Sequence, residues 1–499
     1  MSKKKDDLDT QTQVLEIGSR IKKPPSDAMV NIVFARELGQ QAHLFEAMGL
    51  VDIAYTLTGI KTGLIPHKEG AELLSQLIKL QKRPTNFVLE PSRGDLYTNR
   101  EAWLSEQTTS VGWLGPGRAR REVTTTAFLI VLRNLILKLT GSTIELGKMI
   151  TQLTNLYKKS IMPDYTYLQA AQPTTFGHYL LSFAYPLVRD LERMEQLFHR
   201  VNKSPMGCGS TNGSILTNDR EYMALLLGFS GIATHARDAM WQFDVMIELS
   251  AVLSSSITNL SRLSEDLQIY CTQEFDLVEL DDTHARASKI MPQKKNPFAL
   301  TYIRSIANEL IGSLASISAT ARTPTGQPDN RLSIYSQLPD AIRLVNDCMQ
   351  LMTEVLEHLH FNHKRGKQLV LSGWSLSTDL AESLAQEYGL DFRAAHKLVG
   401  YLAEKYNDEG ILSLDAQKVH KASIEVFGVP INITDDFLKQ VLNPDNSIQS
   451  KKARGSASIK SINNMINECN QIFSDTHKKN MKQQEYFVEI EISLIEQVK

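Results

Sequence analysis

Cysteine is scarce in this sequence, and no two cysteines have a spacing typical of a metal site or a disulfide framework. The 499 residues include only four cysteines, Cys208, Cys271, Cys348 and Cys469, which lie far apart. Neither a zinc site nor a disulfide scaffold is therefore expected. Free thiols suit a reducing compartment, so we expect a cytoplasmic protein.

The sequence also lacks an excess of one charge and a long hydrophobic run. Lys and Arg total 54 against 56 for Asp and Glu, so nothing in the net charge indicates nucleic acid as a partner. The first thirteen residues are polar, and no run of about 18 apolar residues occurs. We expect neither nucleic acid nor membrane as a partner, and any basic site must be local.

Alternation typical of β-strands is nearly absent, and long helical patterns take its place. Apolar residues recur every three or four residues over 124–159 and 221–272, without proline. A helix of fifty residues would be about 75 Å long, so such helices must pack side by side in a bundle. Residues 298–322 and 336–359 supply two more long patterns. The sequence predicts an all-α fold rather than a coiled-coil rod, because no strict heptad persists.

Proline and glycine divide the chain into three predicted domains. Prolines break residues 1–120 into shorter segments, residues 121–366 carry the long helical patterns, and residues 367–499 return to short helices separated by glycine turns. After residue 442 the chain becomes a polar, Lys-rich tail, which closes with an alternating stretch over 486–494 of unassigned role. Broad apolar faces on the long helices predict a homo-oligomer.

The segment 287–297, Ala-Ser-Lys-Ile-Met-Pro-Gln-Lys-Lys-Asn-Pro, combines a hydroxyl, three lysines and a terminal Asn-Pro. One interpretation is a solvated loop whose lysines keep it soluble. The other is a catalytic loop for a dicarboxylate. Cationic and amide groups such as Lys294 and Asn296 can hold carboxylates and stabilise carbanion-like charge that develops beside them.

This segment closely resembles the GSSxMPQKKNP signature of the argininosuccinate lyase branch of the fumarase/aspartase superfamily. These lyases break carbon–nitrogen or carbon–oxygen bonds and release fumarate. Residues 162–173 resemble MPGYTHLQxAQP, residues 260–272 resemble the helix before the signature loop, and 377–381 with 392–396 resemble ATDLA and FREAH. The resemblance implies three domains around a central bundle of long helices, a homotetramer with active sites shared between chains, and no metal or organic cofactor.

By the same resemblance the catalytic serine falls on Ser288, which must be activated by cationic, water-excluding surroundings. Lys294 and Asn296 would hold substrate carboxylates. Two positions depart from the family: Tyr167 stands where the catalytic histidine is expected, and Thr301 where its acidic partner is expected. A tyrosine titrates near 10, so Tyr167 can donate a proton near the leaving nitrogen but is a poor base.

The segment 117–123 resembles the substrate loop GRSRNDQ, but it departs from that pattern too. It keeps Arg120 and has Arg121 in place of asparagine. An extra guanidinium favours an additional carboxylate or phosphate on the ligand; the alternative is that Arg118, Arg120 and Arg121 form a solvated turn. The remaining predicted substrate-binding residues are Thr166, Gln172 and Gln327.

Two hypotheses of different classes follow. The first is a lyase of arginine biosynthesis or related amino-acid metabolism that eliminates an amine or guanidine from an N-substituted aspartate. Argininosuccinate is the nearest named substrate, and another aspartate-type conjugate is the alternative substrate. The second is a catalytically silent relative that keeps the fold for binding or assembly. The missing His-Glu pair supports the second hypothesis, and the presence of Ser288, Lys294 and Asn296 supports the first.

Overall fold

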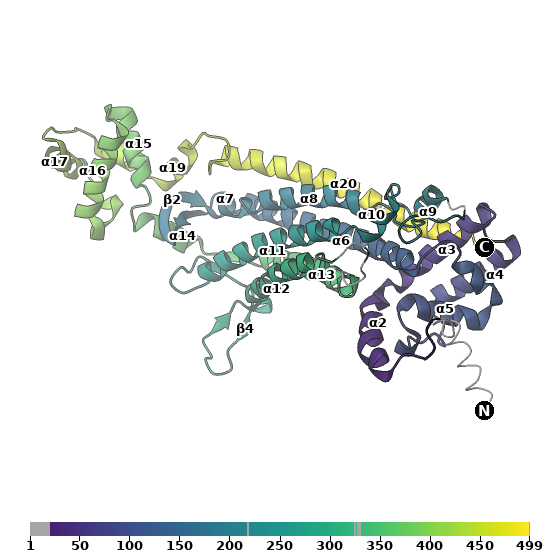
Figure 1. Cartoon of the computed structure of the whole chain (residues 1–499). Coiled ribbons are helices and arrows are strands. Elements are labelled where there is room, and N and C mark those ends of the chain that lie inside the picture. The colour runs from purple at the N-terminus through teal and green to yellow at the C-terminus, as the bar shows by residue number, and fades with distance from the viewer. Residues whose placement is uncertain (1–19, 217–218, 324–325, 327–330, 499) are drawn as a thin grey trace.

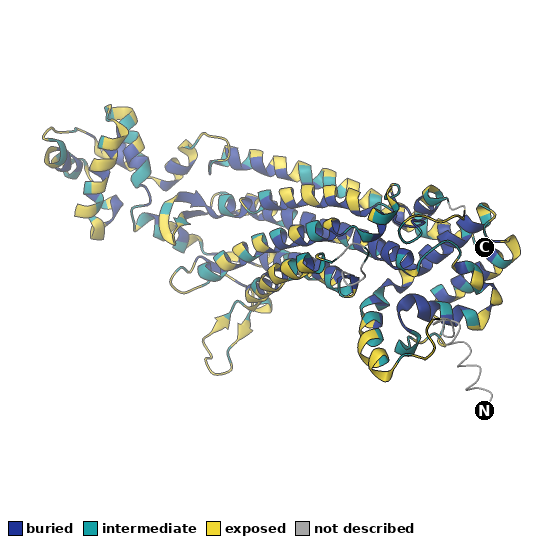
Figure 2. Cartoon of the chain, viewed as in Figure 1, coloured by how far each residue is buried: buried dark blue, intermediate teal, exposed yellow. Residues whose placement is uncertain are grey.

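A computed structural model describes residues 20–216, 219–323, 326 and 331–498. The molecule is elongated, with long helices side by side in the middle and a group of shorter helices at each end (Figure 1). The buried residues line the surfaces where the long helices meet, whereas their outer faces are exposed (Figure 2). The all-α prediction is confirmed: in the described ranges the strands form only three two-stranded pairs.

The central bundle is built on α6, which packs against α8, α13 and α20, while α11 packs against α8, α12 and α13. Leu129, Leu132, Ile136 and Leu139 recur every three or four residues of α6 and are at most 1% exposed, so a single stripe supplies the core. The bundle helices are α6 (Arg120–Tyr157), α8 (Ala184–Val201), α11 (Asp244–Tyr270), α12 (Phe298–Thr320), α13 (Ile334–Glu357) and α20 (Ile459–Glu496).

The N-terminal group of helices packs around the first turns of α6. Its central helix, α3, is buried over most of its length and contacts α4 and α6. The elements of this group are the π-helix η1 (Met29–Phe34), α2 (Ala35–Gln41), η2 (Ala42–Leu44), α3 (Phe45–Lys61), α4 (His67–Gln81), η3 (Pro91–Arg93), α5 (Leu96–Gln107) and η4 (Thr109–Leu114).

The C-terminal group has a hydrophobic core of its own, which runs from Leu376 to Leu442. Gly389 and Gly428 adopt the left-handed conformation that ends α15 and α17. The division of the chain into domains 1–120, 121–366 and 367–499 stays a prediction. The elements of this group are α14 (His363–Leu371), α15 (Ser377–Tyr388), α16 (Phe392–Lys405), η7 (Asn407–Glu409), η8 (Ile411–Ser413), α17 (Ala416–Phe427), α18 (Asp435–Val441) and α19 (Pro444–Ser450).

The end of the chain is not the polar tail expected after residue 442. It forms α20, a helix of 38 residues that returns along α6 and shares the bundle core. Phe473 and Phe487 are buried at 0% and 3% exposure. The helix approaches α6 closely at Gly147, where an added Cβ would lie 2.3 Å from the Phe473 ring.

Three of the four predicted long helices are confirmed as α6, α12 and α13, but the pattern over 221–272 is interrupted. It contains α9 (Arg220–Leu226), α10 (Ala236–Trp241) and α11. The chain leaves the helical path at Gly228 and Gly231, which have φ of 71° and 146°. Conformations with positive φ are open to glycine and end the helix despite the periodic apolar residues around it.

Short antiparallel pairs carry two of the segments singled out in the sequence. Thr166 pairs with Gln169 at the tip of the β1–β2 hairpin, and Arg286 pairs with Asn296 at the base of the signature loop. The remaining elements are β1 (Ile161–Thr166), β2 (Gln169–Thr175), α7 (Phe176–Leu181), β3 (Val278–Glu279) paired with β6 (His360–Phe361), η5 (Asp282–His284), β4 (Arg286–Ala287) and β5 (Lys295–Asn296).

By length and composition, α6 is the one described helix that could cross a membrane. However, 67% of its most apolar window is buried inside the molecule. The core helix of a bundle has this property, because its apolar stripe faces other helices.

Candidate active site

The signature loop projects from the bundle as the β4–β5 hairpin (Figure 1). The Ser288 N–H donates to the Lys294 carbonyl at 3.3 Å, and the Ser288 Oγ accepts a hydrogen bond from the Met291 N–H at 3.2 Å. Asn296 Nδ2 donates to the Arg286 carbonyl at 2.9 Å and closes the base of the loop. Hydrogen bonds among its own residues therefore hold the shape of the loop, and Ser288 lies at its rim.

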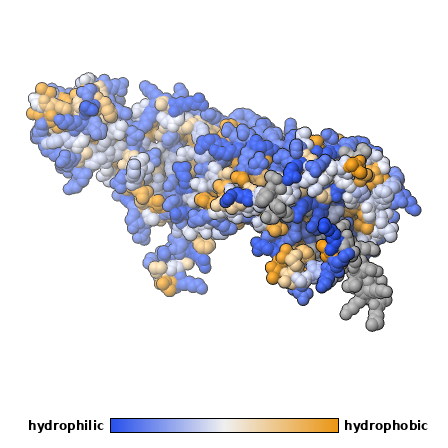
Figure 3. Space-filling view, viewed as in Figure 1, coloured by the Kyte–Doolittle hydropathy of each residue, from blue (hydrophilic) through white to orange (hydrophobic). Residues whose placement is uncertain are grey.

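The two lysines of the signature differ in their surroundings. Lys295 binds Asp282 at 2.8 Å and Glu279 at 3.1 Å, and the hydrogen bond to Asp282 is the main reason that its pKa is raised. Lys294 is exposed and has no ion pair with any described residue. Lys294 is thus a cation available to a ligand. The loop tip also shows apolar surface (Figure 3), with Ile290 86% exposed.

The predicted residues Thr166, Tyr167 and Gln172 lie on the β1–β2 hairpin and are all exposed. Tyr167 and Leu168 form its turn with φ of 54° and 57°. A two-residue hairpin turn of this kind requires two left-handed residues, and it is strained when neither residue is glycine, asparagine or aspartate. Tyr167 is 98% exposed, so its phenol points away from its own chain.

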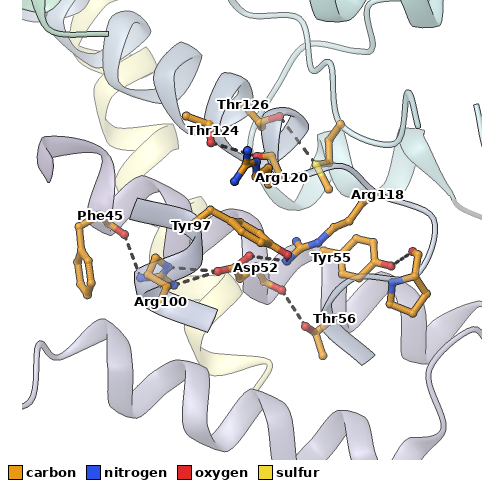
Figure 4. A network of polar contacts seen from close by, with 12 residues as sticks. Phe45, Asp52, Tyr55, Thr56, Tyr97, Arg100, Arg118, Arg120, Thr124 and Thr126 are labelled. Atoms are coloured by element: carbon orange, nitrogen blue, oxygen red, sulfur yellow. Dashed lines mark hydrogen bonds and ion pairs between the residues drawn. The ribbon is translucent and has the colours of Figure 1, made fainter. Parts of the chain in front are cut away.

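The turn before α6 is fixed by a buried ion cluster (Figure 4). Arg118 Nη2 lies 2.9 Å from Asp52 Oδ1, and Arg100 Nη2 lies 3.0 Å from Asp52 Oδ2. All three side chains are at most 1% exposed, and Arg118 stacks over the ring of Tyr55. The solvated-turn alternative is therefore wrong for Arg118, which anchors the turn to α3.

Arg120 and Arg121 begin α6 beside a small polar pocket. Arg120 Nη1 lies 3.5 Å from Asp95 Oδ2, and the Arg120 side chain is 52% exposed. Arg121 is partly buried. The described lining includes charged and phenolic groups that the sequence reading missed, because they come from α2, the start of α5 and the start of α13. These are Glu37, Asp95, Arg331 and Tyr335.

Glu122 joins the start of α6 to the glycine-rich turn 207–213. Its carboxylate is fully buried and accepts hydrogen bonds at 2.9 Å from the N–H groups of Ala119, Gly207 and Ser210. Cys208 in that turn is buried, which raises the pKa of its thiol to about 12. The turn is thus a structural support for the residues at the start of α6, and its thiol is not a nucleophile.

One chain does not bring the predicted site residues together. Arg120 begins α6 and the β1–β2 hairpin follows its end, so the two are separated by roughly 55 Å along a straight helix. The signature loop is a third, separate projection, and Gln327 lies outside the described residues. In the ranges 20–216, 219–323 and 331–498, no group of three His, Cys, Asp or Glu side chains could hold a metal ion.

Comparison with known proteins identifies the class. The family model described as "Lyase" matches residues 22–312, and the model described as "Argininosuccinate lyase C-terminal" matches residues 374–449. With its all-α bundle and projecting signature loop, the protein is an enzyme, a carbon–nitrogen lyase that releases fumarate. It belongs to the argininosuccinate lyase-like branch of the fumarase/aspartase superfamily.

Individual relatives agree with this assignment. The argininosuccinate lyase of Bacillus cereus is 31% identical over 415 residues, covering 82% of this chain and 88% of its own length. That of Methanococcus maripaludis is 27% identical and covers 93% and 95%. Among solved structures, EDDS lyase in complex with formate has a TM-score of 0.85 at 24% identity, covering 95% of this chain and 98% of its own. This likeness shows the fold.

Proposed function

We propose that the protein eliminates an amine or guanidine from an N-substituted aspartate. Argininosuccinate is the nearest named substrate, because the relatives that cover most of the chain are argininosuccinate lyases. The observation that carries the proposal is the signature loop, which presents Ser288 with an unpaired Lys294 on an exposed hairpin. A second candidate, another aspartate-type conjugate, is favoured by Arg121 and Tyr167, which replace family residues.

The proposed chemistry is a β-elimination. Ser288, as its alkoxide, takes the proton from the carbon next to a carboxylate, and Lys294 with Asn296 stabilises the charge that develops there. The electron pair of the broken C–H bond forms the carbon–carbon double bond of fumarate, and the C–N bond breaks. Tyr167 donates a proton to the leaving nitrogen. Exchange with solvent then returns Ser288 and Tyr167 to their starting states.

We further propose a homotetramer in which each site uses several chains, in the cytoplasm. The separation of Arg120, Thr166 and Ser288 within one chain supports shared sites, as does the 98% exposure of Tyr167. Mixing Ser288→Ala protein with Tyr167→Phe protein tests this: shared sites regain activity in mixed oligomers, because some sites then contain neither substitution. A mixture without regained activity contradicts sharing.

The test of function is fumarate release, followed by ultraviolet absorbance, from argininosuccinate and then from a panel of N-substituted aspartates. Ser288→Ala should lower kcat by about a thousandfold or more while binding persists, since it removes the base. Ser493→Ala, an exposed serine of α20, is the matched control and should leave kcat unchanged. Binding without turnover of any substrate would instead favour a catalytically silent protein.

A further inference from the structure

We propose that Arg121 and Arg331 bind an oxyanion, a carboxylate or phosphate, on the nitrogen substituent of the substrate. The inference rests on the proposed function, since it concerns the leaving-group side of the same substrate. It makes the preferred substrate an aspartate whose N-substituent is anionic rather than cationic. The evidence is the charge balance of the small pocket at the start of α6.

Arg331 is a buried guanidinium without a carboxylate partner in the described part of the chain. It is 4% exposed. Its Nη1 donates to the Thr125 hydroxyl at 3.0 Å and its Nη2 to the Met240 carbonyl, both neutral acceptors. Its Nε is buried and makes no hydrogen bond to any described residue. A buried charge that lacks a counter-ion is costly, so with the described residues alone this position carries an unmet preference for an anion.

Arg121 adds a second positive charge to the same pocket. The pKa of its guanidinium is lowered by burial and by the positive charges of Arg120 and Arg331, while Tyr335 and Glu37 oppose this shift in part. Within the described ranges, no carboxylate lies at ion-pair distance from Arg121. Two guanidinium groups that repel each other across one pocket are stabilised together when an oxyanion lies between them, because each can donate two hydrogen bonds to it.

Two of the carboxylates near this pocket, Asp95 and Glu122, are engaged elsewhere. Asp95 accepts from the Thr98 N–H at 2.9 Å, where it caps α5, and pairs with Arg120. Burial is the main reason that the pKa of Glu37 is raised, and the charge of Asp95 raises it further, whereas Arg120 and Arg121 lower it. Glu37 therefore attracts Arg121 but forms no ion pair with it in the described ranges. Glu122 is fully occupied by three backbone N–H groups. Within the described ranges, none of these carboxylates lies at ion-pair distance from Arg121 or Arg331.

The position of Arg121 also favours an anion over a cation. It is the second residue of α6, a helix of 38 residues, and the N-terminus of a helix carries partial positive charge. A cationic substituent would therefore be repelled both by the two arginines and by the helix dipole. The asparagine that the family pattern has at this position would carry no such penalty.

The experiment compares kcat/KM for N-(carboxymethyl)aspartate, N-(phosphonomethyl)aspartate and N-(2-aminoethyl)aspartate. We expect the wild type to prefer an anionic probe by about tenfold or more, and Arg121→Asn to reduce that preference by about tenfold, the effect of one charged hydrogen-bonded contact. The better of the two anionic probes distinguishes carboxylate from phosphate. Arg121→Lys keeps the positive charge but not the planar guanidinium that donates two parallel hydrogen bonds, so it should lose part of the preference for anionic probes.

Arg189→Asn is the matched control, because Arg189 is exposed on α8 and its loss should not change the ratio. Calorimetry with the same probes on Ser288→Ala protein, with and without Arg121→Asn, separates this inference from the proposed function. Tighter binding of an anionic probe that Arg121→Asn abolishes supports the inference even if no probe is turned over. Equal handling of anionic and cationic probes, or no binding of any probe, overturns it.

Discussion

Asp52→Asn is expected to destabilise the N-terminal group of helices more than other single charge changes. Asp52 is the one carboxylate described within ion-pair distance of both Arg100 and Arg118, and all three side chains are at most 1% exposed. Asparagine keeps the shape of the side chain but removes its charge. Two guanidinium groups would then remain buried with only neutral acceptors and the rings of Tyr55 and Tyr97 beside them.

The expected loss is about 3–5 kcal/mol in free energy of unfolding, the effect of removing one partner from a buried ion pair. With a urea dependence of about 3 kcal/mol per molar, the unfolding midpoint should fall by roughly 1 M or more. Tryptophan fluorescence follows the transition, because Trp103 of α5 is buried at 4% exposure. Replacing Trp241 and Trp374, which lie outside the N-terminal group, with phenylalanine makes the signal local. Arg120 and Arg121 follow this anchored turn, so kcat/KM should fall as well.

Asp340→Asn is the matched control. Asp340 pairs with Arg343 at 2.7 Å, but both side chains are largely exposed, at 61% and 43%. An exposed pair contributes less than about 1 kcal/mol. If the urea midpoints of the two variants shift by the same amount, the buried cluster does not stabilise the turn.

Two further predictions concern stability. Burial lowers the pKa of His43 from its ordinary 6.5, so the folded state resists protonation and its stability should fall as the pH decreases below about 6.5. His43→Gln should reduce this loss, measured as the difference between the urea midpoints at pH 7.5 and 5.5. An unchanged difference would refute the prediction. Phe487→Ala should lower the free energy of unfolding by about 3–5 kcal/mol and expose α20 to limited proteolysis, since Phe487 is 3% exposed and lies under Arg133. The control is Val488→Ala, because Val488 is 57% exposed, and it should change stability by no more than about 0.5 kcal/mol. Equal proteolysis of both variants would contradict the packing of α20.

Much of the fold could be predicted from the sequence because the long helices carry a sustained three- and four-residue period. Where the prediction was wrong, either glycines interrupted a long pattern, as over 221–272, or a local pattern was short or ambiguous. The alternating stretch 486–494 includes Ile490 and Leu494, four residues apart, so a helical face was read as alternation. The β1–β2 turn uses Tyr167 and Leu168 in place of the Asn-Gly pair that marks such turns.

The candidate site was predictable only in part, for a different physical reason. The loop with Ser288 is contiguous in sequence, so its residues could be recognised together. The support beneath Arg120 is not contiguous: Asp52 meets Arg118 across 66 residues, and Glu122 meets Gly207 across 85. Pairings over such separations follow from the packing of α3, α6 and the turn 207–213, and no spacing within the sequence indicates them.

The departures from the family pattern change the charge of the proposed shared site in one direction. Thr301 replaces a glutamate and Arg121 replaces an asparagine, so each makes the local charge more positive by one. Thr301 does not regain a carboxylate through its neighbours, since its hydroxyl accepts from the Gln268 amide at 2.7 Å. Loss of a histidine at Tyr167 removes an imidazole that needs a carboxylate beside it. A substrate that brings additional negative charge restores the balance, which is why the missing His-Glu pair and the arginine pocket favour the same substrate class.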